Sequence, residues 1–261
     1  KVTTMMGVPA HYLMLAAHPR FQGTDLSSLG RAVVGGASMP APLLRTWHAR
    51  GVALAQGYGL SEAGPNVLCL PEEEAGARIG MAGKPYPHVD VAVADPVTGE
   101  QLDGPGTGEL LVSGPGVFAG YFRDPEATAA ALAGGWLRTG DIVTVDGDGF
   151  VKVVDRRKEL IITGGFNVSP SEVEEVLRSN QGISDAAVVG LPRGAGGEQV
   201  VAAVFMQPDT ELDEQALRAF CRERLTPYKV PRRIVAIDEL PKSMLGKVLR
   251  KQVRESLQDS L

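Results

Sequence analysis

The sequence predicts a fold of the α/β plus α+β class: a partial doubly wound sheet, a small antiparallel β subdomain, and then a C-terminal α+β domain. Strand and helix signals alternate over residues 1–79. Short strands separated by Gly and Pro turns occupy residues 80–157, and helices mixed with strands fill residues 158–261. The 261 residues, 44% apolar and 22% charged, have the composition of a globular protein with a buried core.

The first region begins with apolar, β-branched runs that predict strands at residues 2–8, 32–34 and 52–56. Helical stretches opened by proline are expected at residues 9–18 and 40–50. Strands that alternate with helices are typical of a parallel, doubly wound sheet. These elements make only part of such a sheet, and the first residue is Lys1 rather than Met, so we expect further sequence upstream.

The second region contains short apolar runs bounded by turn residues, which predict strands at residues 89–94, 108–113, 141–145 and 150–154. Between the last two lies Asp-Gly-Asp-Gly, at residues 146–149. This is a hairpin signal, because these residues tolerate positive φ. The pattern predicts a small antiparallel barrel or sheet.

The third region begins with a helix-start signal at Ser169, followed by helically spaced Val173, Val176 and Leu177. Its remaining predicted elements are strands at residues 186–189, 200–206 and 233–237 and a helix at residues 213–224. Together they form an α+β unit of ordinary domain size.

Composition excludes several classes of function. A net charge of −5 gives no basic field for nucleic acid. Cys69 and Cys221 are too few for a disulfide scaffold and lack metal-ligand spacing, which favours reduced thiols in a cytoplasmic protein. No apolar run reaches membrane-spanning length and no cleavable signal is visible.

A candidate nucleotide site lies at residues 56–62, Gln-Gly-Tyr-Gly-Leu-Ser-Glu. We expect a strand to end here and the backbone to turn through two glycines, which lets main chain approach a ligand closely. The aromatic ring of Tyr58 suits a base, the hydroxyl of Ser61 a phosphate and the carboxylate of Glu62 a magnesium ion. The alternative is a plain glycine-rich turn with a solvated glutamate.

Three further segments carry candidate binding residues. Asp141, in Gly-Trp-Leu-Arg-Thr-Gly-Asp, suits a ribose because a carboxylate can accept from both hydroxyls of a cis-diol, although it could instead cap a turn. Arg156 has a guanidinium fork suited to ribose oxygens and phosphate, against a solvated charged turn as the alternative. Lys247, held behind a glycine, supplies a point charge that can move in and out of a site, against a basic helix start.

Jointly these segments resemble the adenylate-forming enzymes, the family of acyl-CoA synthetases, luciferases and peptide-synthetase adenylation domains. Residues 56–62 resemble its Tyr-Gly-x-Thr-Glu motif, with Ser61 in place of Thr, and residues 34–40 resemble its Gly-Gly-Ala turn. Residues 154–168 resemble the junction between its two domains. Residues 240–250 resemble its lysine motif, although Met244 and Leu245 replace the small polar residues common before Gly-Lys.

The resemblance implies a role for each position. Tyr58 would stack on adenine, Ser61 would touch the α-phosphate, Glu62 would bind Mg²⁺ and act in catalysis, and Asp141 would bind the ribose. Lys158 would be the hinge of a mobile C-terminal domain, and the catalytic Lys247 would contact the carboxylate and α-phosphate. The other residues implied in nucleotide or CoA binding are Gly35, Gly36, Ala37, Gln56, Gly57, Gly59, Arg156, Gly164 and Gly165, the last two beside the pantetheine arm of CoA.

The implied activity is that of a fatty-acyl-CoA synthetase, which joins a medium- or long-chain fatty acid to CoA through an acyl-adenylate. Its cofactors would be ATP/AMP, Mg²⁺ and coenzyme A, and the small domain would rotate between the two steps. Aryl acids are the alternative substrates. The family's phosphate loop ending in Pro-Lys-Gly is missing, so we expect an N-terminal half elsewhere, and the chain alone could be a non-catalytic nucleotide- or CoA-binding fragment. A homodimer stays open.

Overall fold

The computed structural model describes residues 1–96, 98–194, 197–243 and 248–260. It divides into two compact units, Lys1–Val153 and Val154–Leu261. The division lies inside one strand, β11 (Val151–Arg156), a few residues before the start expected for the C-terminal domain. None of the helices in the described residues combines the length and the apolar composition that a membrane span requires.

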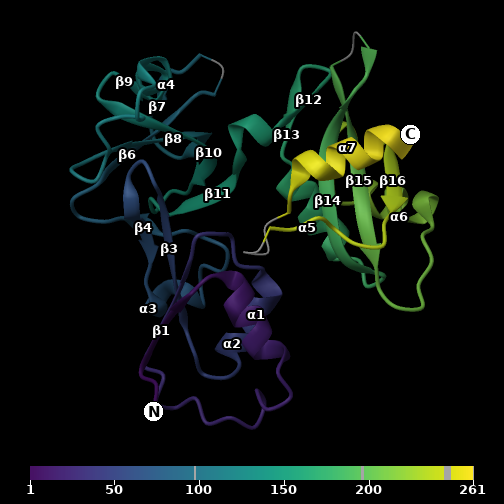
Figure 1. Ribbon diagram of the computed structural model, residues 1–261, viewed down its shortest axis with the longest axis horizontal. Helices are drawn as coiled ribbons and strands as arrows, with labels where there is room; N and C mark the ends of the chain where they lie inside the picture. Colours follow the sequence, from purple (N-terminus) through teal and green to yellow (C-terminus); the bar gives the residue numbers. More distant parts are fainter. Residues whose placement is uncertain (97, 195–196, 244–247, 261) are drawn as a thin grey trace. The chain divides into compact units, whose positions relative to one another are not determined.

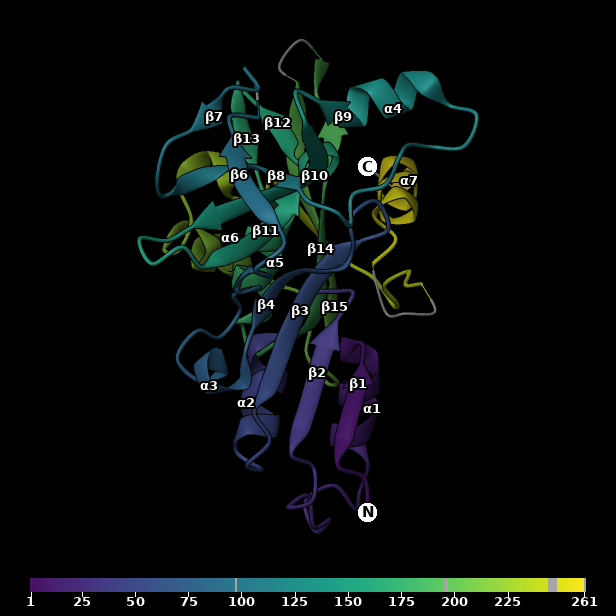
Figure 2. The same ribbon diagram turned by 90° about the vertical axis from the view of Figure 1, so that its left-hand side faces the viewer.

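The first unit begins with a five-stranded sheet in sequential order, which Figure 2 shows from one side. Its strands are β1 (Thr4–Gly7), β2 (Arg31–Gly35), β3 (Leu54–Leu60), β4 (Gly64–Leu70) and β5 (Lys84–Pro85). Strands β1, β2 and β3 pair in parallel, connected by α1 (Pro9–Ala17) and α2 (Ala41–His48), which confirms the predicted parallel sheet. Strands β4 and β5 pair antiparallel and were not predicted, and the acidic residues 72–74 open the short helix α3 (Glu72–Ala75).

Aromatic side chains fix these two helices on the sheet. The rings of Tyr12 and Phe21 meet the ring of Trp47 edge to face, with centroids 5.2 and 4.9 Å away. The Tyr12 hydroxyl donates to the Val33 carbonyl at 2.8 Å, and the Trp47 indole N–H donates to the Tyr12 carbonyl at 3.2 Å. The polar atoms of these buried rings are thus satisfied, as burial of Tyr and Trp requires.

The expected end of the third strand at residue 56 is wrong. Strand β3 runs on to Leu60, so Gly57 and Gly59 lie inside it, and the turn comes afterwards at residues 61–63. Antiparallel pairing with β4 extends the strand, with a register shift between Tyr58 and Leu60. A Cβ added to Gly59 would lie 2.4 Å from the Gly64 carbonyl oxygen, so close approach of the two strands requires glycine there.

The second sheet of this unit is antiparallel, as predicted, in the order β11-β10-β8-β6-β7. The further strands are β6 (Asp90–Ala94), β7 (Gln101–Leu102), β8 (Gly106–Ser113) and β10 (Trp136–Val145), with β9 (Leu132–Ala133) paired to β10 and preceded by α4 (Pro125–Ala131). Strand β10 begins earlier than expected and shifts register between Arg138 and Ile142, so Asp141 lies at a bulge inside the strand. The predicted hairpin at residues 146–149 joins β10 and β11, and Gly149 has a φ of 81°.

The second unit is built on the sheet β14 (Ile183–Pro192), β15 (Glu198–Met206) and β16 (Arg233–Ala236) (Figure 1). Helices α5 (Pro170–Arg178) and α6 (Glu214–Arg222) pack on one face and α7 (Arg250–Ser260) on the other. Alternate residues of β14 and β15 therefore enter two different apolar clusters, as the period of two of a strand demands. The predicted α+β domain is confirmed, and α7 begins at Arg250, in the segment for which a basic helix start was the alternative interpretation.

A short hairpin and two single helical turns complete this unit. The hairpin consists of β12 (Ile161–Thr163) and β13 (Phe166–Val168), and the turns are η1 (Arg157–Glu159) and η3 (Pro227–Lys229). Ser169 caps the N-terminus of helix α5, where its side chain accepts from the Glu172 N–H at 3.3 Å, as the helix-start signal predicted.

Candidate adenylate and coenzyme A site

Two predicted glycine segments meet where parallel strands end. Gly35 of β2 pairs with Gly57 of β3, and a Cβ on Gly35 would lie 3.0 Å from the Gly57 carbonyl oxygen. Gly36 then turns the chain out of the sheet with a φ of 79°, which favours glycine, and Ala37 follows as an exposed residue. The carboxyl ends of parallel strands are where open α/β sheets bind their ligands, so this edge is a candidate nucleotide site.

The structure joins the predicted base and ribose residues directly. The Tyr58 hydroxyl donates to Asp141 Oδ2 at 2.6 Å, across 83 positions of sequence. Asp141 is only 6% exposed, and the Thr139 hydroxyl both accepts from the Asp141 N–H at 3.1 Å and donates to the Leu110 carbonyl at 2.7 Å. The bulge of β10 thus fixes the carboxylate beside the ring of Tyr58.

Gln56 brings an amide group to the same edge. Its side chain is 9% exposed, and among the described residues its Nε2 has no hydrogen-bond partner. A buried amide donor left unpaired costs about 1–3 kcal/mol. A ligand acceptor would remove that cost, which fits the predicted role in nucleotide binding.

Sequence reasoning missed the residue that supports this bulge. Glu109 of β8 is 2% exposed and accepts from Arg138 Nε at 3.1 Å, from Arg138 Nη2, and from the Gly140 N–H at 3.2 Å. A buried carboxylate needs such partners. A charged residue directly before the apolar run Leu-Leu-Val was the signal that could have revealed it.

Glu62 lies in the turn between β3 and β4, next to the exposed Ser61. Its Oε1 accepts from the Tyr121 hydroxyl at 2.8 Å, and its backbone carbonyl accepts from the Phe118 N–H at 2.8 Å. The hydrogen bond to Glu62 raises the pKa of Tyr121 above its ordinary value. Both aromatic residues belong to the segment 114–122, for which no role was predicted.

The donor groups around Glu62 suit a magnesium ion that is held by one carboxylate together with waters and substrate phosphates. Among the described residues no group of three or more His, Cys, Asp and Glu side chains could hold a metal. Mg²⁺ usually keeps several waters and is held by one or two carboxylates together with substrate phosphates rather than by a protein cage. A single carboxylate in a turn next to a hydroxyl fits that arrangement.

The remaining predicted residues belong to the second unit. Arg156 and Lys158 are exposed, and Arg156 follows the buried Asp155, whose Oδ2 accepts from the Ser169 hydroxyl at 2.7 Å. Gly164 and Gly165 form the two-residue turn between β12 and β13, with φ values of 56° and 85°. A turn with two positive φ angles favours glycine on its own, and nothing lies within 4 Å of a Cβ added at either position. Lys247 lies outside the described residues.

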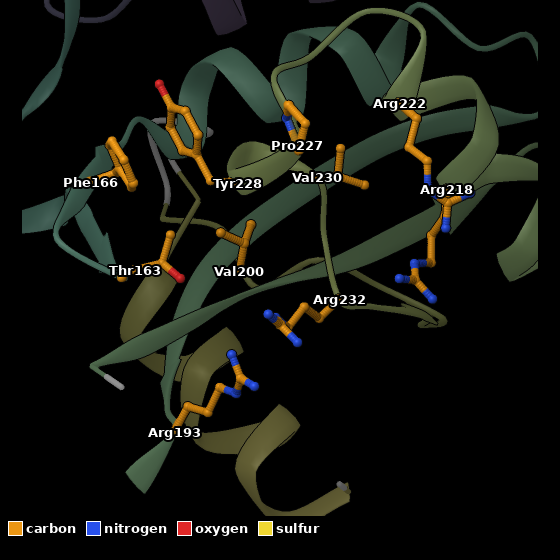
Figure 3. Close-up of a pocket in the computed structure, with 11 residues that line it drawn as sticks. Thr163, Phe166, Arg193, Val200, Arg218, Arg222, Pro227, Tyr228, Val230 and Arg232 are labelled. Atoms are coloured by element: carbon orange, nitrogen blue, oxygen red, sulfur yellow. The ribbon is translucent and has the colours of Figure 1, made fainter. Parts of the chain in front are cut away.

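A cavity of about 600 Å³ begins at this glycine turn (Figure 3). The rings of Phe166 and Tyr228 line it, stacked with centroids 4.5 Å apart and planes 18° apart. Four guanidinium groups also line it, from Arg193, Arg218, Arg222 and Arg232. Such a set suits a ligand with several phosphates and an aromatic base.

Sequence reasoning missed all six of these side chains. Their positions span residues 166–232 and form no local motif. Only the fold gathers them. The basic run Pro-Tyr-Lys-Val-Pro-Arg-Arg at 227–233 was the strongest available signal.

Two family models match parts of the chain. The model of the AMP-binding enzyme family matches residues 1–122, and the model of the AMP-binding enzyme C-terminal domain matches residues 172–247. A feruloyl-CoA synthase from Amycolatopsis sp is 44% identical over 97% of this chain and 52% of its own length. A long-chain-fatty-acid–CoA ligase from Bacillus subtilis (strain 168) is 40% identical over 98% of this chain and 46% of its own length.

Solved structures give the same result. The crystal structure of ATP-bound MatB from Rhodopseudomonas palustris is 34% identical and superposes with a TM-score of 0.91 over 100% of this chain and 52% of that one. The chain spans about half the length of the curated relatives it matches. With both matched models, 40–44% identity to these relatives and the predicted fold in place, the chain belongs to the AMP-binding enzymes of the adenylate-forming superfamily.

Proposed function

We propose that the chain is the part of an AMP-forming acid–CoA ligase that binds adenosine and coenzyme A. The observation that carries this proposal is the hydrogen bond between Tyr58 and Asp141 at the carboxyl ends of the parallel strands. It places an aromatic ring and a buried carboxylate side by side, as a base and a ribose diol would need. The relatives named for feruloyl-CoA and long-chain fatty-acyl-CoA synthesis support the same reaction class.

In the first step, a carboxylate oxygen of the acid bonds to the α-phosphorus of ATP and pyrophosphate leaves. Tyr58, Asp141 and Gln56 would hold the adenosine so that the α-phosphate faces the acid, which is mainly catalysis by positioning. Mg²⁺, when bound at Glu62, would neutralise phosphate charge. Lys247 would supply a second positive charge at the oxygens on which charge develops.

In the second step, the sulfur of CoA attacks the acyl carbonyl, the bond to the adenylate oxygen breaks, and AMP leaves. The thiol proton passes to solvent. We propose that the C-terminal domain turns at Lys158 between the steps, removing Lys247 and bringing the Gly164–Gly165 turn to the acyl-adenylate. The open space above that turn supports passage of the pantetheine arm.

For the acid, we propose a medium- or long-chain fatty acid, on the resemblance of the segments at 164–170 and 240–250 to fatty-acyl-CoA ligases. An aryl acid is the second candidate, because the relative at 44% identity is named for feruloyl-CoA. For a polypeptide of residues 1–261 alone, the alternative function is binding of nucleotide and CoA without turnover, since the sequence contains no phosphate loop ending in Pro-Lys-Gly.

An acid panel tests this assignment. The intact natural polypeptide, incubated with Mg·ATP, hydroxylamine and either laurate, palmitate, ferulate or acetate, is expected to release pyrophosphate and form a hydroxamate with the fatty acids. Hydroxamate formed only with ferulate would contradict the fatty-acid assignment and identify an aryl acid as the substrate. No pyrophosphate release dependent on any acid would contradict the ligase assignment. Hydroxamate formed by residues 1–261 alone would exclude the non-catalytic alternative.

The arginine-lined cavity supplies a second prediction. Arg232→Gln is expected to raise the KM for CoA about tenfold, because one charge-assisted contact to phosphate is lost. The turnover of pantetheine, which has the thiol but no nucleotide, should not change. Steady-state kinetics with both thiols measures the difference.

The neighbouring residue provides the control. Arg233 does not line the cavity, and its Nε pairs with Glu214 at 3.4 Å. Arg233→Gln should therefore leave the KM for CoA unchanged. An equal change of the KM for CoA in both variants, or an equal loss of activity with pantetheine, would contradict the assignment of this cavity to CoA.

A further inference from the structure

The segment that follows β8 lies against the turn that carries Glu62. We propose that Tyr121 is a positioning residue that holds the Glu62 carboxylate ready for a magnesium–nucleotide complex. The proposal deepens the proposed function and rests on it for the role of Glu62. Nothing in the motif that contains Glu62 points to Tyr121, which is 59 residues further along the chain.

The segment 114–122 contacts Glu62 through two hydrogen bonds. The Phe118 N–H donates to the Glu62 carbonyl and the Tyr121 hydroxyl donates to its carboxylate, each at 2.8 Å. A Cβ on Gly116 would lie 2.8 Å from the Ala63 carbonyl oxygen, so glycine is needed for this close approach. Both the backbone and the side chain of Glu62 are thus held by one segment.

Tyr121 is itself fixed by contacts with Phe118 and Thr128. Its ring meets the ring of Phe118 edge to face, with centroids 4.8 Å apart. Its backbone N–H donates to the Thr128 hydroxyl of α4 at 2.9 Å, and Gly120 is so close to Thr128 that a Cβ would lie 2.6 Å from its methyl group. The phenol therefore reaches Glu62 from a fixed position, although Tyr121 remains 40% exposed.

A fixed phenol does what a metal-binding carboxylate needs. Its O–H occupies one direction at Oε1 and leaves the remaining lone pairs of the carboxylate for a cation, because an ionised carboxylate has about four acceptor sites. Without this hydrogen bond, the glutamate side chain would lose conformational entropy when it binds the cation. Because the hydrogen bond already orders the side chain in the folded protein, less entropy is lost on binding. Partners of this kind commonly orient metal-binding groups, and their removal weakens metal binding.

The test compares two nucleotides that differ in their need for metal. In the intact natural polypeptide, Tyr121→Phe is expected to raise the Kd for Mg·ATP roughly three- to tenfold, measured by isothermal titration calorimetry, and to leave the Kd for AMP without metal unchanged. The Mg²⁺ concentration that gives half-maximal pyrophosphate release should rise by the same factor. Tyr121→Phe keeps the ring on Phe118, so packing is preserved.

Phe122→Ala is the matched control, because Phe122 is adjacent and 88% exposed. It should change neither Kd. An unchanged Kd for Mg·ATP in Tyr121→Phe, or equal weakening of AMP and Mg·ATP, would overturn the positioning role. If the unaltered protein binds both nucleotides but releases no pyrophosphate, the ligase proposal fails and the ratio of the two Kd values still decides the role of Tyr121. If it binds Mg·ATP no better than ATP with EDTA, the positioning role of Tyr121 fails, whereas the ligase proposal still depends on pyrophosphate release.

Discussion

Replacement of Lys247 by alanine is expected to lower the rate of acyl-adenylate formation by about 10²–10³-fold, because one fixed positive charge is lost where charge develops on the phosphoryl oxygens. Thioester formation from supplied acyl-adenylate and CoA should continue near the rate of the unaltered protein. The physical reason is that the proposed domain rotation removes this lysine before the second step. Separate assays of the two half-reactions measure the contrast.

Lys242→Ala is the control for this experiment. Lys242 lies in the same basic segment, but its Nζ pairs with Asp185 Oδ2 at 2.6 Å on a partly exposed surface. Its loss should leave adenylation within about twofold, as for most exposed ion pairs. Equal losses in both half-reactions of Lys247→Ala would contradict the assigned role of this lysine.

Asp141→Ala is expected to weaken AMP binding about 100-fold, because it removes the buried carboxylate that is proposed to accept from both ribose hydroxyls. It should also abolish the preference for AMP over its 2′,3′-dideoxy analogue. Calorimetric titration of the two ligands measures that preference directly.

The hydrogen bond from Tyr58 complicates Asp141→Ala, because the substitution also removes the acceptor of that hydroxyl. Tyr58→Phe isolates this contribution, since it deletes the hydroxyl and keeps both the ring and the carboxylate. We expect Tyr58→Phe to keep the preference for the ribose hydroxyls. Retention of the preference in Asp141→Ala would contradict the ribose assignment.

The sequence predicted those elements whose signals are local. Proline-opened helices, β-branched strands and the Asp-Gly-Asp-Gly hairpin each depend on neighbouring residues, and the structure contains them. The end of β3 could not be predicted in the same way. Its residues 57–60 read as a glycine turn, and only pairing with β4 makes them a strand. Tertiary context here overrode local preference.

The same distinction between local and long-range signals applies to the candidate site. Tyr58, Glu62 and Asp141 stand in segments with a recognisable pattern, so each could be singled out alone. The residues that hold them could not. Glu109 and Tyr121 act across 31 and 59 positions, and their role exists only once the β-sheet and the segment 114–122 are folded. Side-chain contacts at such separations leave no periodicity or spacing in a single sequence.

In the proposed reaction a carboxylate oxygen of the acid attacks the α-phosphorus of ATP, and an isotopic measurement can follow that oxygen into the products. The acid is labelled with ¹⁸O in both carboxylate oxygens and converted with Mg·ATP and CoA, and the products are analysed by mass spectrometry. We predict one ¹⁸O atom in the phosphate of AMP, one in the carbonyl of the thioester and none in pyrophosphate. Unlabelled AMP, or label in inorganic phosphate formed together with ADP, would contradict it.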